Sequence, residues 1–303
     1  MSKTISLGSL TVDRVVECGR YRFAPDALFP SLTRDHVRQS ADWLDARLID
    51  RGTGDLFLSF HSYVIRVNGR VILVDTCSGN HKDRPALPAH HQLNTRYLEN
   101  LVASGVRPEE VDVVLCTHLH PDHTGWNTQR ADGRWVPTFP NARYLMSAID
   151  FAHFEEFYSR RPTDPVAADV ARSFEDSVLP IAEAGQADLV SLDHRVHDEL
   201  AAGVWFESAA GHSPGQVIIH AKSAEHHAVF SADVMHHPVQ LQNLSMPMGG
   251  DADPLAAAAT RHRLVQAYVD TGTLILPAHF PDPCIGRFSS SADELRFAWL
   301  ERN

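Results

Sequence analysis

The sequence predicts an α/β (α+β) fold of the four-layer αβ/βα sandwich type. Apolar runs with strand character come in two groups, residues 10–114 and 204–276, and each group is followed by helix. Two mixed sheets would then pack face to face, with helices on their outer faces. The chain has 303 residues, 44% of them hydrophobic, which suffices for a sizeable core. We therefore expect residues 1–303 to form a single domain.

The first group contains four predicted strands. Residues 10–16 form the first strand, and residues 61–67 and 71–75 form a hairpin that turns at Asn68-Gly69. Residues 111–116 have the β-branched composition of a short buried strand.

The segment 21–57 lies between the first two strands and outside the expected sheet. It carries two prolines and several aromatic and apolar residues, followed by a helical stretch at 34–48. We predict a lid or mouth segment over the functional site, with ordinary surface packing as the equal alternative.

Four further helices are predicted at residues 93–104, 147–160, 166–184 and 254–270. Asp253 caps the last of these, with Pro254 at its first position. Residues 127–200 form the longest insertion between the candidate site segments. Its aromatic residues recur at helical spacing, which favours core packing over substrate contact, and they are Phe151, Phe154, Phe157 and Tyr158.

Three histidines and one aspartate lie within six positions just after the strand at 111–116. His118 and His120 are two apart and can share one side of an extended segment, whereas Asp122 and His123 follow a proline turn and can face elsewhere. This spacing suits two adjacent metals, and imidazole with carboxylate favours Zn²⁺ and related ions. The alternative is a solvated, histidine-rich loop.

The segment from Thr117 to Gly125 resembles the HxHxDH signature of the metallo-β-lactamase-fold hydrolases. Three later segments fit the order of that family, namely Gly211-His212-Ser213-Pro214-Gly215, Phe230-Ser231-Ala232-Asp233 and Leu276-Pro277-Ala278-His279-Phe280. The resemblance extends from about His61 to about Phe288. It implies the metallo-β-lactamase type of sandwich, with the ligand loops along one edge.

This resemblance also implies two metal ions. The first would be bound by His118, His120 and His212, the second by Asp122, His123 and His279, and Asp233 would bridge them. Zn²⁺ is favoured as the divalent ion, with Mn²⁺, Fe or Co²⁺ as alternatives. Asp75 resembles the family's aspartate beneath the site, so we predict that it orients a ligand histidine, with a strand-end turn as the alternative.

Two such cations lower the pKa of a shared water and polarise the bond under attack. A metal-bridging hydroxide would therefore hydrolyse an ester or a lactone. Asp122 and Asp233 are the carboxylates expected nearest to that water, either to accept or to steer its proton, although Asp233 is favoured as a ligand. The sequence has no GxSxG, P-loop or GxGxxG after a strand, which argues against serine hydrolases, nucleotide-binding proteins and dehydrogenases.

His236 follows Asp233 by three positions. The homoserine-lactone lactonases that the chain resembles carry there a tyrosine that helps to hold the substrate carbonyl. We predict that His236 contacts the substrate, with a plain loop residue before Pro238 as the alternative. The replacement argues against homoserine lactones but leaves lactonase or arylesterase chemistry intact. Since the C-terminal part has no Lys/Arg cluster, we expect a neutral small-molecule substrate with an apolar or aromatic part.

Several other functions are compatible with the same motif. A phosphotriesterase resembling methyl-parathion hydrolase is one alternative, and a glyoxalase II-like thioester hydrolase is another, although it would want a basic pocket. β-Lactamase activity is less favoured, because it is usually found in exported proteins. A flavodiiron reductase is less favoured because it would require a carboxylate in place of His120. The non-enzyme alternative is an inactive metal-binding protein.

Charge and composition limit the partners. The formal net charge of −11 argues against nucleic acid, which attracts basic surfaces. No signal-peptide h-region or 18-residue apolar run is present, so we expect a cytoplasmic protein without a membrane partner. A homodimer is compatible with the sequence. The four cysteines form no CxxC pair and are predicted to be reduced, and they are Cys18, Cys77, Cys116 and Cys284.

Six of the other histidines are interpreted as ordinary loop residues exposed to solvent. They are His90, His91, His194, His197, His226 and His227. Gln216 stands where many relatives carry a second histidine, and this difference is not expected to affect metal binding.

Overall fold

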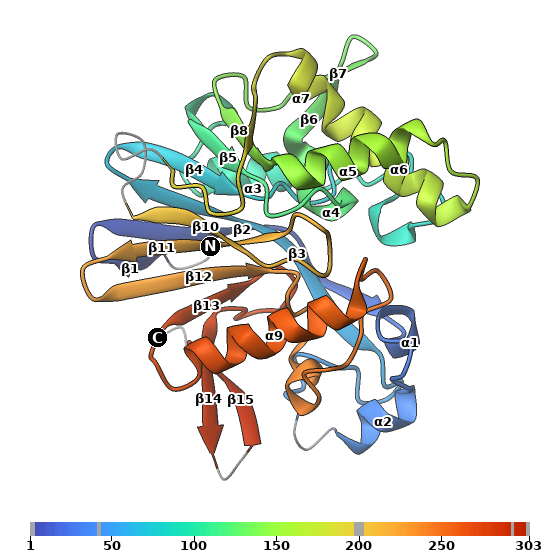
Figure 1. Ribbon diagram of the computed structural model, residues 1–303, viewed down its shortest axis with the longest axis vertical. Coiled ribbons are helices and arrows are strands. Elements are labelled where there is room, and N and C mark those ends of the chain that lie inside the picture. Colours follow the sequence, from blue (N-terminus) through green and yellow to red (C-terminus); the bar gives the residue numbers. More distant parts are fainter. Residues whose placement is uncertain (1–3, 41–43, 197–202, 292–293, 301–303) are drawn as a thin grey trace.

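The computed structural model describes residues 4–40, 44–196, 203–291 and 294–300. Two sheets face each other at its centre, and helices cover the outer face of each sheet (Figure 1). This arrangement confirms the predicted α/β sandwich of four layers.

The first sheet contains seven strands in the order β1-β2-β3-β4-β5-β8-β9. Its pairs are antiparallel from β1 to β4 and parallel from β4 to β9. At the predicted hairpin, Asn68 and Gly69 both have positive φ, 51° and 73°, as the tight turn between β3 and β4 requires. The strands are β1 (Ile5–Leu7), β2 (Leu10–Phe23), β3 (Leu56–Val67), β4 (Arg70–Val74), β5 (Val113–Leu115), β8 (Arg143–Ser147) and β9 (Ala187–Val190).

The second sheet has six strands in the order β10 to β15. Only β12 and β13 pair in parallel within it. Its strands are β10 (Val204–Ser208), β11 (Val217–Ser223), β12 (His226–Ala232), β13 (Leu274–Pro277), β14 (Gly286–Ser291) and β15 (Glu294–Trp299). A separate hairpin is formed by β6 (Thr128–Ala131) and β7 (Arg134–Pro137).

Four helices cover the first sheet, and one covers the second (Figure 1). The first set comprises α3 (Tyr97–Ala103), α5 (Ala148–Ser159), α6 (Pro165–Ser177) and α7 (Leu179–Glu183), and the second sheet is covered by α9 (Pro254–Tyr268). Asp253 caps α9 as predicted, because its side chain accepts hydrogen bonds from the N–H groups of Leu255 and Ala256. The shorter helices are α1 (Pro25–Leu28), α2 (Arg34–Gln39), α4 (Pro121–Thr124), η1 (Pro88–His90), η2 (Pro108–Glu110), η3 (Gly125–Asn127) and η4 (Pro238–Gln242).

The central strands are buried on both faces, which explains their continuous apolar runs. In β4, Ile72 and Val74 point into the core between the sheets, whereas Leu73 joins the core beneath the outer helices. In β5, Val114 likewise lies in the core beneath the outer helices, whereas its two neighbours in the strand point into the core between the sheets. Each fully buried side chain of this kind contributes roughly 1.5–3 kcal/mol to folding. The two cores therefore hold the strand ends, and the loops that follow them, in fixed positions.

Two predicted helices differ from the observed ones. The stretch 34–48 is helical only in α2, and residues 41–43 of it lie outside the described residues. At its end, Asp45 accepts a hydrogen bond from the Arg47 N–H, a local turn that competes with helix. The stretch 166–184 is split into α6 and α7, because Pro180 cannot donate the backbone hydrogen bond that a continuous helix would need.

The prediction that segment 21–57 lies outside the sheet is partly wrong. Residues 21–23 extend β2, and residues 56–57 begin β3, so both ends of segment 21–57 pair with each other in the first sheet. The insertion 127–200 contributes β8 and β9 to the same sheet. The prediction failed because extensions of a few residues are too short to show the alternation of apolar and polar residues that indicates a strand.

The four cysteines form no disulfide within the described chain, as predicted. No helix among the described residues is long and apolar enough to span a membrane.

Candidate metal centre

The predicted site residues meet at one edge of the sandwich because they all follow strand ends. His118 and His120 lie just after β5, and the N-cap His120 leads directly into α4, which carries Asp122 and His123. The loop after β10 carries His212, and β12 and β13 are followed by Asp233 and His279. The structure thus brings all seven predicted ligands together, from both sheets.

Two local backbone features aim these side chains. The register of β12 shifts between Phe230 and Ala232, and Ala232 has a positive φ of 46°, so the strand turns Asp233 toward the edge. Gly211 must be glycine, because a Cβ atom there would lie 2.2 Å from the Ala257 nitrogen of α9. This close packing places His212 beside the start of α9.

The first group consists of three imidazoles that point at a common centre. Nδ1 of His120 lies 3.0 Å from Nε2 of His118 and 2.9 Å from Nε2 of His212. Nitrogen ligands around a tetrahedral Zn²⁺ are about 3.3 Å apart, given Zn–N distances of about 2.0–2.1 Å. The spacing therefore matches that of three ligands on one ion.

The second group consists of one carboxylate and two imidazoles. Nε2 of His279 lies 3.3 Å from Nε2 of His123 and 3.6 Å from Oδ2 of Asp122. The distance from His123 Nε2 to Asp122 Oδ2 is 3.9 Å. These three side chains also form a set that could hold one ion.

Asp233 lies between the groups and directs one oxygen toward each. Its Oδ1 is 3.0 Å from Nε2 of His279 and 3.3 Å from Nε2 of His123. Its Oδ2 is 3.3 Å from Nε2 of His212. Oδ1 is buried and has no hydrogen-bond partner among the described residues, so it is left open for a cation.

The other ring nitrogens of four histidines are held by oxygen atoms. Nδ1 of His123 donates to Asp75 at 2.8 Å, and Nδ1 of His212 donates to Asp251 at 2.9 Å. Nδ1 of His279 lies 3.1 Å from the Ser59 carbonyl oxygen, and Nδ1 of His118 lies 3.1 Å from the Thr117 hydroxyl. Such contacts fix the tautomer and aim Nε2 into the cluster. Asp251 escaped sequence reasoning, because no local pattern connects it with a histidine 39 positions earlier.

Asp150 ties two of the site loops together. Its carboxylate accepts hydrogen bonds from the Leu119 N–H at 3.2 Å, the Ser213 hydroxyl at 2.7 Å and the Gly215 N–H at 2.5 Å. A Cβ atom on Gly215 would lie only 2.5 Å from the Asp150 nitrogen, so this contact requires glycine. Asp150 therefore sets the distance between the first two ligand segments, a role that its predicted helix did not indicate.

The two carboxylates and two of the imidazoles have the charge of metal ligands, whereas in His123, His212 and His279 nearby carboxylates outweigh burial and raise the pKa, so that metal binding would release protons there. Burial, reinforced by neighbouring imidazoles, lowers the pKa of His120 to about 3 and that of His118 well below its ordinary value. Burial raises the pKa of Asp122 and Asp233, but the imidazoles, His123 foremost, outweigh burial and hold both pKa values below the ordinary range. Ionised carboxylates and neutral imidazoles are the forms that bind metal.

His236 is buried against this cluster. Its Nε2 lies 3.0 Å from Oδ2 of Asp233, and its ring is stacked over that of His279 with centroids 5.5 Å apart. Neither ring nitrogen has a hydrogen-bond partner among the described residues. His236 and His237 both lie in the loop before Pro238 and are buried, and Nε2 of His237 donates to the Leu48 carbonyl at 3.0 Å. A contact of His236 with the substrate stays a prediction.

Other histidine interpretations need correction. His90 is partly buried and ends the short helix η1, and its ring packs edge-on against Phe60. His226 and His227 lie in β12 rather than in a loop, and Nε2 of His227 contacts Nδ1 of His220 at 3.0 Å. His91 binds the Arg84 N–H through Nδ1, while His197 lies outside the described residues.

Two more predictions can be compared with the structure. Phe154 is buried in the core, as predicted for its helix, but it also contacts the His120 ring at 5.5 Å. Gln216 is buried, and its amide donates to the Ala209 carbonyl at 3.1 Å.

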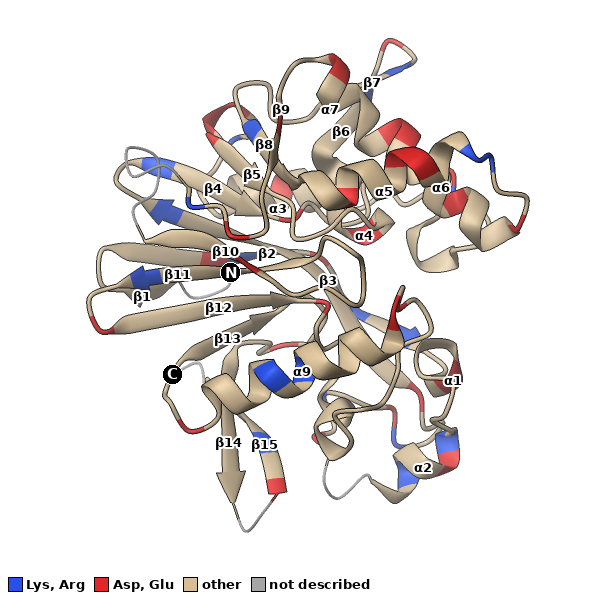
Figure 2. Ribbon diagram, in the orientation of Figure 1, with Lys and Arg blue, Asp and Glu red and all other residues tan. Residues whose placement is uncertain are grey.

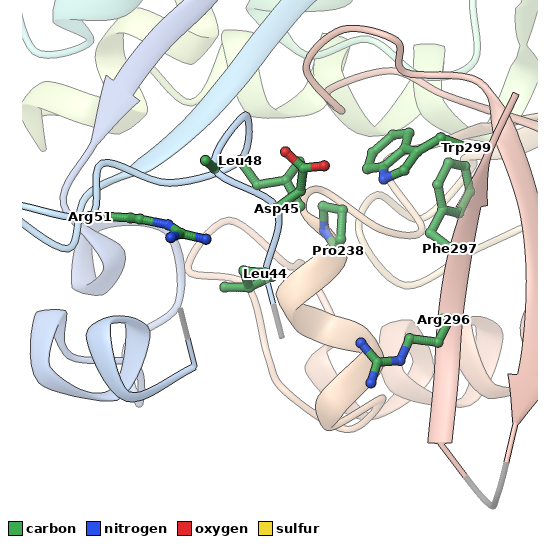
Figure 3. Close-up of a pocket in the computed structure, with 9 residues that line it drawn as sticks. Leu44, Asp45, Leu48, Arg51, Pro238, Arg296, Phe297 and Trp299 are labelled. Carbon is green, nitrogen blue, oxygen red and sulfur yellow. The ribbon is translucent and has the colours of Figure 1, made fainter. Parts of the chain in front are cut away.

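A separate hollow of about 450 Å³ lies between the 44–51 segment and β15. Arg51 and Arg296 approach it from opposite sides, and Phe297 and Trp299 form one wall (Figure 3). The hollow shares no residue with the metal-ligand candidates. In the ribbon view of Figure 2, the Lys and Arg positions are spread over several helices, strands and loops.

The donor set therefore fits divalent metal ions of the first transition row. It offers imidazole and carboxylate atoms in two adjacent groups, with a carboxylate between them and oxygen partners on the outward nitrogens. No thiolate belongs to either group of the described residues.

The chain belongs to the metallo-β-lactamase superfamily, whose family model matches residues 58–279. Comparison with curated proteins finds no match. Among solved structures, the hydrolase AbOPH of the β-lactamase superfamily is similar with a TM-score of 0.81 and 22% identity, covering 99% of this chain and 97% of that one. AidC, a dizinc quorum-quenching lactonase in complex with its product N-hexanoyl-L-homoserine, gives a TM-score of 0.77 and 18% identity, covering 99% and 98%. At these identities the likeness establishes the fold.

Proposed function

We propose that the protein is a dinuclear metallo-hydrolase that cleaves neutral lactones or esters of the lactonase and arylesterase type. The observation that carries this proposal is the position of Asp233. One of its oxygens faces His123 and His279, and the other faces His212 and lies near His118. A carboxylate in this position is suited to join two cations.

The proposed ligands are the predicted ones. His118, His120 and His212 would hold the first ion, Asp122, His123 and His279 the second, and Asp233 both. Zn²⁺ is the favoured ion, with Mn²⁺, Fe or Co²⁺ as alternatives. When bound, such a pair supplies a strongly nucleophilic oxygen from water at neutral pH and polarises the carbonyl under attack.

The side chains around the centre have distinct proposed roles. Asp122 and Asp233 stay ionised and are the carboxylates that can steer the proton of the attacking water. Nε2 of His236 lies 3.0 Å from Oδ2 of Asp233, and His236 is proposed to hold the substrate oxygen. Its hydrogen bond would strengthen as negative charge develops on that oxygen.

The surroundings favour a neutral substrate with an apolar or aromatic part. Tyr21, Phe23 and Phe60 form a chain of ring contacts, with centroids 4.9 Å and 6.4 Å apart, and Phe60 reaches the His279 ring at 5.3 Å. None of the seven ligand candidates forms an ion pair with a Lys or Arg of the described chain. An aromatic wall without a cationic clamp suits an uncharged ligand better than a polyanion.

Segment 21–57 is proposed to cover the mouth of the centre. The Gly249 N–H donates to the Leu28 carbonyl at 2.8 Å. A Cβ atom on the neighbouring Gly250 would lie 3.8 Å from Cε1 of His212. The segment and the centre thus both lie close to the same short loop.

Metal analysis combined with a substrate panel tests the proposal. After reconstitution with Zn²⁺, the protein should hold close to two ions per chain and hydrolyse aryl esters and aromatic or alkyl lactones, and a chelator should abolish turnover. One ion or fewer would overturn the dinuclear centre. Preference for a glutathione thioester or a phosphotriester would replace the substrate class, and metal binding without any turnover would favour an inactive metal-binding protein.

A further inference from the structure

The hollow between the 44–51 segment and β15 is large enough for a small organic ligand. Its volume of about 450 Å³ lies within the range of small-molecule sites, about 300–1,000 Å³. Leu44 and Leu48 from the segment, together with Pro238 at the start of η4, are buried and supply its aliphatic part. The hollow lies apart from the metal-ligand candidates, so an occupant would need no metal.

One wall of the hollow is aromatic. Phe297 and Trp299 are two positions apart in β15, so their side chains lie on the same face of that strand. Their rings meet edge-on, with centroids 4.8 Å apart and an interplanar angle of 73°. Phe280 meets Trp299 in a similar way at 6.1 Å and 64°. These contacts hold the indole in place, and a planar aromatic group packs well against such a wall.

Two guanidinium groups approach the hollow from opposite sides (Figure 3). Arg51 comes from the 44–51 segment and is exposed, whereas Arg296 comes from β15 and has a side chain that is 43% exposed. Arg296 pairs with Glu294, whose side chain is 59% exposed. Exposed pairs of this kind are weak, and a guanidinium has five N–H donors. Arg296 therefore keeps the capacity to bind a second carboxylate.

The carboxylate in the lining has a cationic partner of its own. Asp45 accepts hydrogen bonds from the N–H of Arg47 at 2.8 Å and from its Nε at 2.9 Å. Arg47 does not belong to the described residues that line the hollow. The charge of Asp45 is thus matched from outside, while Arg51 and Arg296 add two positive charges to the lining. On a chain whose formal net charge is −11, this hollow is a local site of attraction for an anion.

We propose that the hollow binds a small aromatic carboxylate. The ring would pack against Trp299 and Phe297, and the two guanidinium groups would attract the carboxylate, whose planar geometry matches theirs. The site is separate from the candidate metal centre. The inference is therefore independent of the proposed hydrolase function.

Benzoate is a suitable probe, and its dissociation constant would be measured on the full chain by ligand-observed NMR titration, with and without a chelator. Benzyl alcohol keeps the ring but lacks the charge, whereas cyclohexanecarboxylate keeps the charge but lacks the aromatic ring. Arg51→Met and Arg296→Met each remove one positive charge and keep a long side chain. Arg70→Met is the matched control, because Arg70 is 46% exposed, pairs with Asp112 and is not part of the lining.

Each of the two lining variants should weaken benzoate binding about tenfold, the lower end of the range for one hydrogen bond to a charged group. Benzyl alcohol and cyclohexanecarboxylate should bind clearly more weakly than benzoate, and neither Arg70→Met nor the chelator should change the dissociation constant. A wild type that binds no benzoate would overturn the assignment, as would binding within twofold of the wild type in either lining variant. Binding that disappears on removal of the metal would overturn it as well, because it would place benzoate at the metal centre.

Discussion

Oδ2 of Asp75 lies 2.8 Å from Nδ1 of His123, so the carboxylate beneath the site fixes the direction in which that imidazole points. The same carboxylate accepts hydrogen bonds from the N–H and the hydroxyl of Thr117, both at 2.8 Å. Asp75 therefore joins the end of β4 to the first residue of the histidine motif. Its φ of 55° is a value that aspartate and asparagine tolerate better than most residues.

Asp75→Asn should lower the affinity for the second metal ion. Asparagine fits the backbone but removes the negative charge that supports His123, so we expect about a ten- to hundredfold loss of affinity. Competition with a chromophoric chelator would measure it. Asp132→Asn, in the exposed β6–β7 turn, is the matched control. Unchanged affinity would mean that Asp75 only stabilises the turn at the end of β4 and does not orient His123.

Asp233→Asn should lower both metal content and kcat with little loss of fold. The substitution keeps the size of the side chain but removes the charge shared by the two groups. Elemental analysis, circular dichroism and ester turnover would be measured together. His226→Ala is expected to be nearly silent, because that side chain is exposed. Full activity of Asp233→Asn would show that this residue is not a ligand.

His236→Ala should lower kcat by about two orders of magnitude or more, on the scale of one oxyanion donor, roughly 2.7–4 kcal/mol. Both metals should remain bound, because the proposed ligand set is complete without this residue. A variant that loses one metal would instead make His236 a ligand beside His212 and Asp233, a set whose geometry would also allow it. Unchanged kinetics would exclude any contact with the substrate.

The stability of the metal-free protein should fall on acidification, partly because of His237. Burial lowers the pKa of His237 from 6.5 to about 4. The unfolded chain therefore binds this proton more readily, so the contribution of neutral His237 is complete above pH 6.5 and is lost as the pH falls toward 4. The loss should reach about 3 kcal/mol. Urea unfolding of wild type and His237→Gln at pH 7.5 and 4.5 would measure it, and equal pH dependence in both proteins would refute the assignment.

The residues that carry the motif were predictable because they are close in sequence or follow a strand. The spacing of His118, His120, Asp122 and His123 indicated a metal site without any tertiary information. The later segments could be placed only through their resemblance to a family. The fold class followed from the two groups of apolar runs, because strands buried on both faces cannot be polar.

What sequence reasoning missed depends on distant contacts. Asp251 supports His212 from 39 positions away, and Asp150 joins two loops from within a helix. His90 resembles any solvated histidine until Ser78 and Phe60 are placed around it. Two helices were predicted to be too long, because the apolar period continued past a local turn at Asp45 and past Pro180.

The division of the donor atoms between the two sheets has a consequence for protein engineering. The first group takes its third nitrogen from His212, and the second takes its third donor from His279, both from the second half of the chain. Fragments 1–190 and 204–303 would each carry an incomplete set for either ion. A metal-dependent signal from separately expressed halves would therefore report that the two fragments have associated.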